Sequence, residues 1–127
     1  MNEARTPPPP RGLGKRGKAF WKEMQSEIEF DGPQTQVLWE ACRTLDRLEA
    51  LDDVIAAEGV TARGSTGQVV VHPAVSEARQ LQVVLTRLVT ALNLPLSEDE
   101  ERAAQAWRNE RAKKASAASH GYLKAMN

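Results

Sequence analysis

The side chains that could carry out chemistry are few in this chain. Its 127 residues include a single cysteine, Cys42, only two histidines, His72 and His120, and one tyrosine. One cysteine excludes an intramolecular disulfide and a multi-thiolate metal site. Cys42 falls on the apolar stripe of an expected helix, where a free thiol packs as a small hydrophobe more often than it acts as a nucleophile. We therefore expect no catalytic residues, no metal site, no cofactor and no enzymatic activity.

Two glycine-containing strings resemble ligand-binding loops. Residues 12–17 match G-x-G-x-x-G, but a dinucleotide fingerprint follows a strand within a β-α-β unit. Here four prolines, Pro7–Pro10, precede the string, and no parallel sheet is expected. Residues 64–67 match the GXXG loop of nucleic-acid-binding KH modules, again without the surrounding pattern. We interpret residues 64–67 as a tight turn and exclude dinucleotide binding at residues 12–17.

The formal net charge is zero, but the charges are unevenly distributed. Residues 1–18 carry Arg5, Arg11, Lys15, Arg16 and Lys18 against one acid, whereas residues 33–59 are acidic and the last basic residues cluster after residue 101. Basic ends on an acidic middle indicate an anionic partner reached by arms. The alternative is that both ends are solvated tails that only aid solubility.

The elements that must position these charges are helical. Residues 1–17 are predicted to be a disordered basic arm, because Pro7–Pro10 favour polyproline II and three glycines follow. A short helix is expected from Lys18 to about Glu29, with Phe20, Trp21, Met24 and Ile28 at helical spacing. That spacing favours core packing of Phe20 and Trp21 over base stacking.

Two long helices should follow, from Pro33 to about Glu58 and from Pro73 to about Asn93. Val60–Arg63 and Gln68–Val71 either pair as a small β-hairpin between them or form an irregular connection. Both alternatives let the helices return antiparallel. The predicted core and oligomerisation residues are Leu38, Leu45, Leu48, Ile55, Ala78, Leu81, Leu85, Leu88 and Leu92.

The remainder, residues 96–127, is predicted to be a charged helical tail that frays at its end. Ser97 and Glu100 form an S-x-x-E capping box, and alanines support the helix. Trp107 is the one large apolar residue in its first part. The predicted fold is therefore all-α, with a helical oligomerisation domain over residues 18–95.

Apolar residues off the main stripes indicate self-association. Val54 lies off the stripe of the first long helix, and Val83, Val84 and Val89 lie off the stripe of the second. A lone hairpin would leave these residues as an exposed apolar patch. We expect a homo-oligomer that covers it.

The order of these features resembles the small subunit of a tailed-bacteriophage terminase. The resemblance covers residues 12–95: Gly-Leu-Gly-Lys-Arg-Gly-Lys-Ala-Phe-Trp at 12–21, the helix containing residues 40–48, Gly-Ser-Thr-Gly-Gln at 64–68, Val-His-Pro-Ala-Val at 71–75, and the helix ending Leu-Asn-Leu-Pro at 92–95. It implies a non-catalytic subunit that forms a ring, recognises double-stranded viral DNA and recruits a large ATPase-nuclease subunit in the host cytoplasm. Many members carry an N-terminal helix-turn-helix, which this sequence does not display.

Candidate residues follow from the charges and the resemblance together. The DNA-binding candidates are Arg5, Arg11, Lys15, Arg16, Lys18, Arg63, Arg79, Arg87, Arg111, Lys113 and Lys114. The candidates for docking the large subunit are Trp107, Arg108 and Arg111. The helix over residues 33–58 is too acidic to read DNA in a groove. Two other functions remain open: a helical scaffold or adaptor without DNA binding, and a small transcriptional regulator.

No membrane partner is expected, because no run of about 18 apolar residues occurs. The first twenty residues lack the apolar core of a secretory signal, so secretion is not expected either. The single cysteine fits a reducing compartment. We therefore expect a soluble protein.

Overall fold

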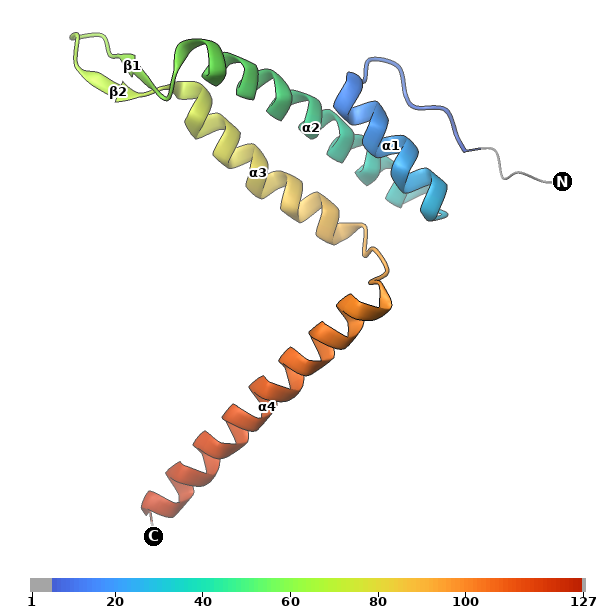
Figure 1. The fold of residues 1–127 in the computed structure, drawn as a ribbon, viewed down its shortest axis with the longest axis vertical. Helices are drawn as coiled ribbons and strands as arrows, with labels where there is room; N and C mark the ends of the chain where they lie inside the picture. Colours follow the sequence, from blue (N-terminus) through green and yellow to red (C-terminus); the bar gives the residue numbers. More distant parts are fainter. Residues whose placement is uncertain (1–5, 127) are drawn as a thin grey trace, which may run out of the picture. The chain divides into compact units, whose positions relative to one another are not determined.

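The computed structural model describes residues 6–126, apart from the side chains of residues 122, 123, 125 and 126. Four helices and a small two-stranded sheet follow each other along the chain (Figure 1). They are α1 (Lys15–Glu27), α2 (Gly32–Glu58), β1 (Thr61–Arg63), β2 (Val69–Val71), α3 (Pro73–Ala91) and α4 (Glu98–Met126). The chain divides into two compact units, Met1–Asn93 and Leu94–Asn127, which are described separately below. The mostly helical fold predicted from the sequence is confirmed.

In the first unit, α2 and α3 form the predicted antiparallel hairpin, and α1 packs along the N-terminal half of α2 (Figure 1). Asp31 caps α2: its carboxylate accepts the Gln34 backbone N–H at 2.8 Å, and the Gln34 side chain accepts the Asp31 N–H at 3.1 Å. Pro33 occupies the first turn, where its missing N–H leaves no hydrogen bond unmade. Gly59 ends the helix with a φ of 85°, a conformation that glycine adopts freely.

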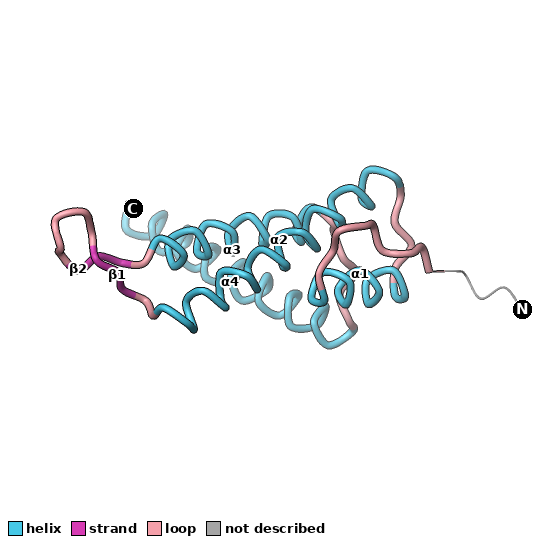
Figure 2. The backbone as a smooth tube through the Cα atoms, turned by 90° about the horizontal axis from the view of Figure 1, so that it is seen from above, coloured by secondary structure: helices cyan, strands magenta, loops and turns pink. Residues whose placement is uncertain are grey.

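The connection between the two long helices is the β-hairpin, so the irregular alternative is wrong. Strands β1 and β2 pair antiparallel, with Thr61 opposite Val71 and Arg63 opposite Val69 (Figure 2). Gly67 turns the ribbon with a φ of 84°, which identifies residues 64–67 as a turn. His72 then caps α3, as its Nδ1 accepts the Ala74 backbone N–H at 3.0 Å.

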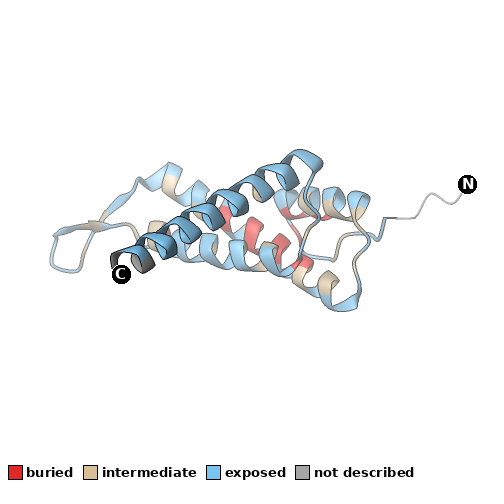
Figure 3. Ribbon diagram, turned by 90° about the horizontal axis from the view of Figure 1, so that it is seen from below, coloured by how far each residue is buried: buried red, intermediate tan, exposed pale blue. Residues whose placement is uncertain are grey.

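The buried side chains concentrate where α1, α2 and α3 come together (Figure 3). Leu38, Ala41 and Cys42 are fully buried, and Trp21 and Leu13 are 3% and 5% exposed. Of the predicted core, Leu38, Leu45, Leu48, Ala78 and Leu92 are buried, whereas Ile55, Leu81, Leu85 and Leu88 are half-buried. The hairpin therefore has a closed core around α2 from Leu38 to Leu48, and its seam with α3 stays partly open at Leu81, Leu85 and Leu88.

The predicted disordered arm is wrong for the part that the structure describes. Residues 15–17 already belong to α1, and Leu13 is buried. The indole N–H of Trp21 donates to the Pro7 carbonyl oxygen at 2.9 Å, which fixes the proline segment beside α1. The prediction did not take into account the burial of Leu13 and the hydrogen bond from Trp21. These two contacts offset the conformational entropy that is lost when the segment becomes ordered. Arg5 and the rest of residues 1–5 lie outside the described residues.

In the second unit, α4 begins with the predicted capping box. The Ser97 hydroxyl accepts the Glu100 backbone N–H at 3.2 Å, and the Glu100 carboxylate accepts the Ser97 N–H at 2.9 Å. Hydrogen bonding from the Ser97 backbone N–H, and to a smaller extent from the Ser97 side chain, lowers the pKa of the Glu100 carboxylate. The helix continues to Met126.

Candidate nucleic-acid interface

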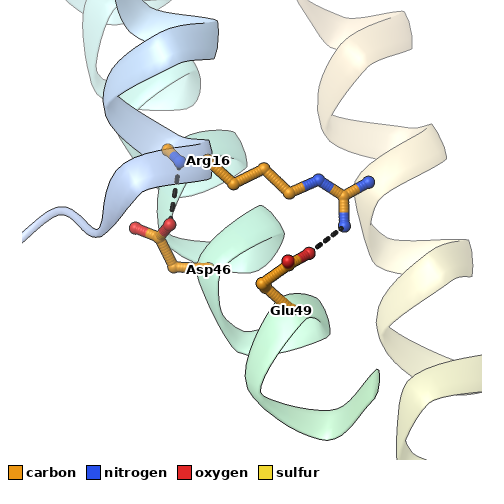
Figure 4. A network of polar contacts seen from close by, with 4 residues as sticks. Arg16, Asp46 and Glu49 are labelled. Atoms are coloured by element: carbon orange, nitrogen blue, oxygen red, sulfur yellow. Dashed lines mark hydrogen bonds and ion pairs between the residues drawn. The ribbon is translucent and has the colours of Figure 1, made fainter. Parts of the chain in front are cut away.

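A carboxylate on α2 fixes the first turn of α1. Asp46 accepts the backbone N–H of Gly14 at 2.7 Å through Oδ2 and that of Gly17 at 2.8 Å through Oδ1. Figure 4 shows the Asp46 carboxylate on α2 with a hydrogen bond to the backbone of α1. The N-terminal N–H groups of a helix have no partner within the helix, and its dipole favours a negative charge at this end. Asp46 therefore acts as a helix cap supplied from a neighbouring helix. We call Gly14, Gly17 and Asp46 the Asp46 clamp.

The glycines of the clamp are required by close approach. A Cβ on Gly17 would lie 2.7 Å from the Cys42 carbonyl oxygen, and a Cβ on Gly14 would lie 2.9 Å from Asp46 Oδ1. The spacing that imitates a dinucleotide fingerprint thus serves helix-to-helix packing. Sequence reasoning excluded the fingerprint but assigned the glycines to a disordered arm, since their partner Asp46 lies 29 residues beyond Gly17.

An exposed ion pair lies beside the clamp. Arg16 Nη1 lies 3.4 Å from Glu49 Oε2, with the two side chains 44% and 57% exposed (Figure 4). Arg16, one of the predicted DNA-binding cations, thus pairs with an acidic residue of α2. Arg16 is therefore less free to meet a phosphate than its position in the sequence indicated.

Three lysines form an exposed cationic face on α1. Lys15, Lys18 and Lys22 follow each other at spacings of three and four residues, which places them on one side of a helix, and all three are exposed. Among the residues that the structure describes, none of the three takes part in an ion pair. We call this set the α1 lysine face. Lys22 is absent from the sequence-based candidates, although its spacing from Lys15 and Lys18 could have identified it.

The other predicted cations of the first unit lie apart from this face in the sequence. Arg11 is exposed just before α1, and Arg79 and Arg87 are exposed on α3, two helical turns apart. Arg63 lies on β1, where its Nη1 donates to the Gly67 carbonyl oxygen at 3.0 Å and so supports the turn of the hairpin. Only Lys15, Arg16 and Lys18 among the candidates share one element of this unit with the added Lys22.

The candidates of the second unit all lie on α4. Trp107 is 62% exposed, and the Arg111 guanidinium lies 5.1 Å from the centre of its ring, a cation–π contact. Arg108 is committed to its own helix, 3.6 Å from Glu101 and 2.8 Å from the Gln105 side-chain oxygen. Lys113 and Lys114 are exposed. This helix thus presents an aromatic residue flanked by cations.

Few of the described side chains could act as a nucleophile or bind a metal ion. Cys42 is fully buried, and burial, with a smaller contribution from the charge of Asp46, raises the pKa of its thiol to about 12. Within residues 6–126, no group of three or more His, Cys, Asp or Glu side chains could hold a metal ion. No helix in the described part is long and apolar enough to cross a membrane.

Comparisons with protein-family models, curated proteins and solved structures give no significant match. The arguments about function therefore depend on the residues and their geometry.

Proposed function

We propose that this chain is a terminase small subunit of a tailed phage, which binds double-stranded viral DNA and regulates a large packaging subunit without catalysis of its own. The sequence resemblance over residues 12–95 supports the family. The observation that carries DNA binding is the α1 lysine face. Three exposed lysines on one helix contribute positive charge with no acid of the described residues paired to it.

The Asp46 clamp gives the lysine face a defined position. A disordered arm loses conformational entropy when it binds, whereas a helix already held by two hydrogen bonds loses less. Several copies in one ring would multiply these phosphate contacts, since linked weak sites gain effective concentration. Half-buried Leu81, Leu85 and Leu88 and the exposed Val83 and Val84 support self-association.

The second unit is proposed to contact the large subunit in the host cytoplasm. Tryptophan and arginine are the residues that most often dominate protein interfaces, and α4 offers Trp107 with Arg111 above its ring. Lys113 and Lys114 can add DNA contacts from the same helix.

The test of DNA binding is a salt titration with duplex DNA. A variant with Lys15→Gln, Lys18→Gln and Lys22→Gln should bind more weakly than the unaltered chain. The slope of log K against log salt should become shallower by about 0.9 for each phosphate that the variant protomer no longer neutralises. The control variant carries Arg43→Gln, Arg102→Gln and Lys124→Gln, which changes net charge equally but leaves the lysine face intact.

Equal slopes of log K against log salt for the two variants would show that the α1 lysine face does not contact DNA phosphates. An absence of DNA binding by the unaltered chain at low salt would instead support a helical adaptor.

A further inference from the structure

The β-hairpin projects beyond the ends of α2 and α3 as a two-stranded ribbon (Figure 1, Figure 2). In this ribbon Thr61 lies opposite Val71, and Arg63 lies opposite Val69. Residues that face each other across an antiparallel pair, or lie two apart on one strand, point to the same side of the ribbon. All four are exposed, Val69 by 68% and Val71 by 60%, whereas the residues between them are half-buried. We call Thr61, Arg63, Val69 and Val71 the ribbon face.

Hydrogen bonds fix the turn of this ribbon. The Gly64 N–H donates to the Gln68 carbonyl oxygen at 2.7 Å, and the Gly67 N–H donates to the Gly64 carbonyl oxygen at 3.0 Å. The Gln68 side-chain oxygen accepts the Thr66 N–H at 3.0 Å, and Arg63 Nη1 donates to the Gly67 carbonyl oxygen. A guanidinium has five N–H donors, so Arg63 keeps donors for a ligand. The ribbon face therefore has a defined shape before a partner binds, which lowers the entropy cost of binding.

The charge around the ribbon face favours an anionic partner. Residues 59–76 contain no Asp or Glu, and Arg63 has no ion-pair partner among residues 6–126. Glu58, the acid that precedes the ribbon, lies 3.2 Å from His72 Nε2. A strand of a partner protein is a poorer occupant, because strands of three residues offer it few backbone hydrogen bonds.

Duplex DNA has a groove that fits this ribbon. The major groove is about 12 Å wide and admits a two-stranded ribbon, whose strands lie about 4.8 Å apart. Guanine presents two acceptors there, O6 and N7, which suit an arginine, and thymine presents a methyl group, which suits an apolar side chain. The α1 lysine face is suited to phosphates, which carry no sequence information. Arg63, Val69 and Val71 thus offer the base contacts that the lysines lack.

The lysine face and the ribbon face are close enough to contact the same turn of DNA. Arg16, near the start of α1, lies 3.4 Å from Glu49, and α2 continues from there to Glu58, just before the ribbon. At about 1.5 Å per residue this part of α2 is about 14 Å long, whereas one turn of duplex DNA is about 34 Å long. Phosphate and base contacts within one turn are therefore compatible with the spacing along α2.

We infer that the ribbon face reads DNA sequence in the major groove. Arg63 donates to O6 and N7 of a guanine, and Val69 and Val71 contact the methyl group of a neighbouring thymine. This inference rests on the DNA binding of the proposed function. It assigns the sequence preference to a different element from the one that contacts phosphates.

The test is the selection of bound sequences from a random pool of duplex DNA by the full chain. The unaltered chain should enrich sites that contain a guanine beside a thymine. Arg63→Gln should reduce the preference for that guanine on the order of tenfold and shift it towards adenine, because glutamine pairs with N6 and N7 of adenine. Loss of folding cannot produce such a switch.

Two further variants separate sequence reading from phosphate binding. The variant with Lys15→Gln, Lys18→Gln and Lys22→Gln should bind every sequence more weakly but keep the guanine preference. Arg43→Gln, which removes an exposed arginine of α2 outside both faces, is the matched control and should keep both affinity and preference.

A change in the DNA tests the same contact without altering the protein. Replacing the preferred guanine by 7-deazaguanine removes N7 and should weaken binding by the unaltered chain, whereas Arg63→Gln should lose less. Replacing the neighbouring thymine by deoxyuridine removes the methyl group and should also weaken binding by the unaltered chain.

The outcomes distinguish this inference from the proposed function. DNA binding without a sequence preference, a guanine preference retained by Arg63→Gln, or equal weakening of both chains by 7-deazaguanine would overturn the inference and leave the proposed DNA binding intact. An absence of binding to any duplex at low salt would overturn both.

Discussion

The two halves of α2 differ in the number of helices that cover them. The N-terminal half packs between α1 and α3, and its Leu38, Ala41 and Cys42 are fully buried. From Leu51 onward α2 has α3 as its main neighbour, so Leu51 and Ile55 stay half-buried and Val54 is exposed. Two helices bury one stripe each, and a third is needed to enclose a helix from a second side. The first half therefore stabilises the fold, whereas the second has surface available for a partner.

The largest expected effect comes from removing a leucine at the closed end. Leu38→Ala should lower the free energy of unfolding by about 3 kcal/mol, since a fully buried leucine leaves a cavity. Leu85→Ala at the half-buried seam should lower it by about 1.5 kcal/mol. Urea unfolding followed by circular dichroism measures both.

The same pair of variants can sharpen the comparison between the two halves. If a second copy covers the seam, the destabilisation by Leu85→Ala should grow with protein concentration, because association stabilises the folded state. The destabilisation by Leu38→Ala should change less. Equal effects at all concentrations would contradict the difference between a closed end and an open seam.

The next effect tests how α1 is attached to the closed half. Gly17→Ala should lower the free energy of unfolding by about 2 kcal/mol, because the added Cβ would meet the Cys42 carbonyl oxygen at 2.7 Å and also the Asp46 carboxylate. Gly32→Ala, at the start of α2, is the control and should stay within about 0.5 kcal/mol of the original chain, since nothing lies within 4 Å of its added Cβ. If Gly17→Ala left the free energy of unfolding unchanged, α1 would not pack closely on α2.

The reactivity of the Cys42 thiol tests whether the N-terminal half of α2 stays covered by its neighbouring helices. Its pKa is raised from 9.0 to about 12, so the folded thiol should react with a disulfide reagent at pH 8 far more slowly than the thiol of the urea-unfolded chain. The folded state holds the thiol proton more tightly than the unfolded state. This contribution to stability is therefore complete below pH 9 and is lost as pH rises from 9 towards 12.

The pH dependence has its own control. Cys42→Ala removes this thiol while retaining a small apolar side chain, so it should reduce the decline in stability between pH 9 and 12. Rapid labelling of the folded chain, or an unchanged pH profile in Cys42→Ala, would indicate that α1 opens readily from α2.

Local patterns predicted most of the fold, because caps and stripes act over a few residues. Ser97 occupies the helix start at which the sequence predicted a capping box, and the two long helices begin at or beside the predicted Pro33 and Pro73. The predicted core residues from Ala78 to Leu92 likewise lie on one side of α3, and Ala78 and Leu92 are buried. These signals need no knowledge of distant residues.

The arrangement of the candidate site depended on distant residues and was therefore missed. Nothing near Gly14 and Gly17 in the sequence indicates that Asp46 caps their helix, and nothing near Pro7 indicates the hydrogen bond from Trp21. The arm was consequently predicted to be disordered. Lys22 was missed for a different reason. The sequence shows its spacing from Lys15 and Lys18, but the helix was expected to begin at Lys18, so Lys15 was not placed on the same helix.

The smallest expected effect concerns the ion pair beside the Asp46 clamp. Arg16→Gln should lower the free energy of unfolding by at most about 0.5 kcal/mol, because Arg16 and Glu49 are each about half exposed and their attraction is screened by water and salt. Lys18→Gln, which removes a cation without an ion-pair partner among the described residues, is the control and should leave stability unchanged. Thermal unfolding at low and high salt measures the difference between the two variants, which should disappear at high salt. A destabilisation by Arg16→Gln as large as that by Gly17→Ala would mean that the ion pair, and not the Asp46 clamp, holds α1 to the closed half of α2.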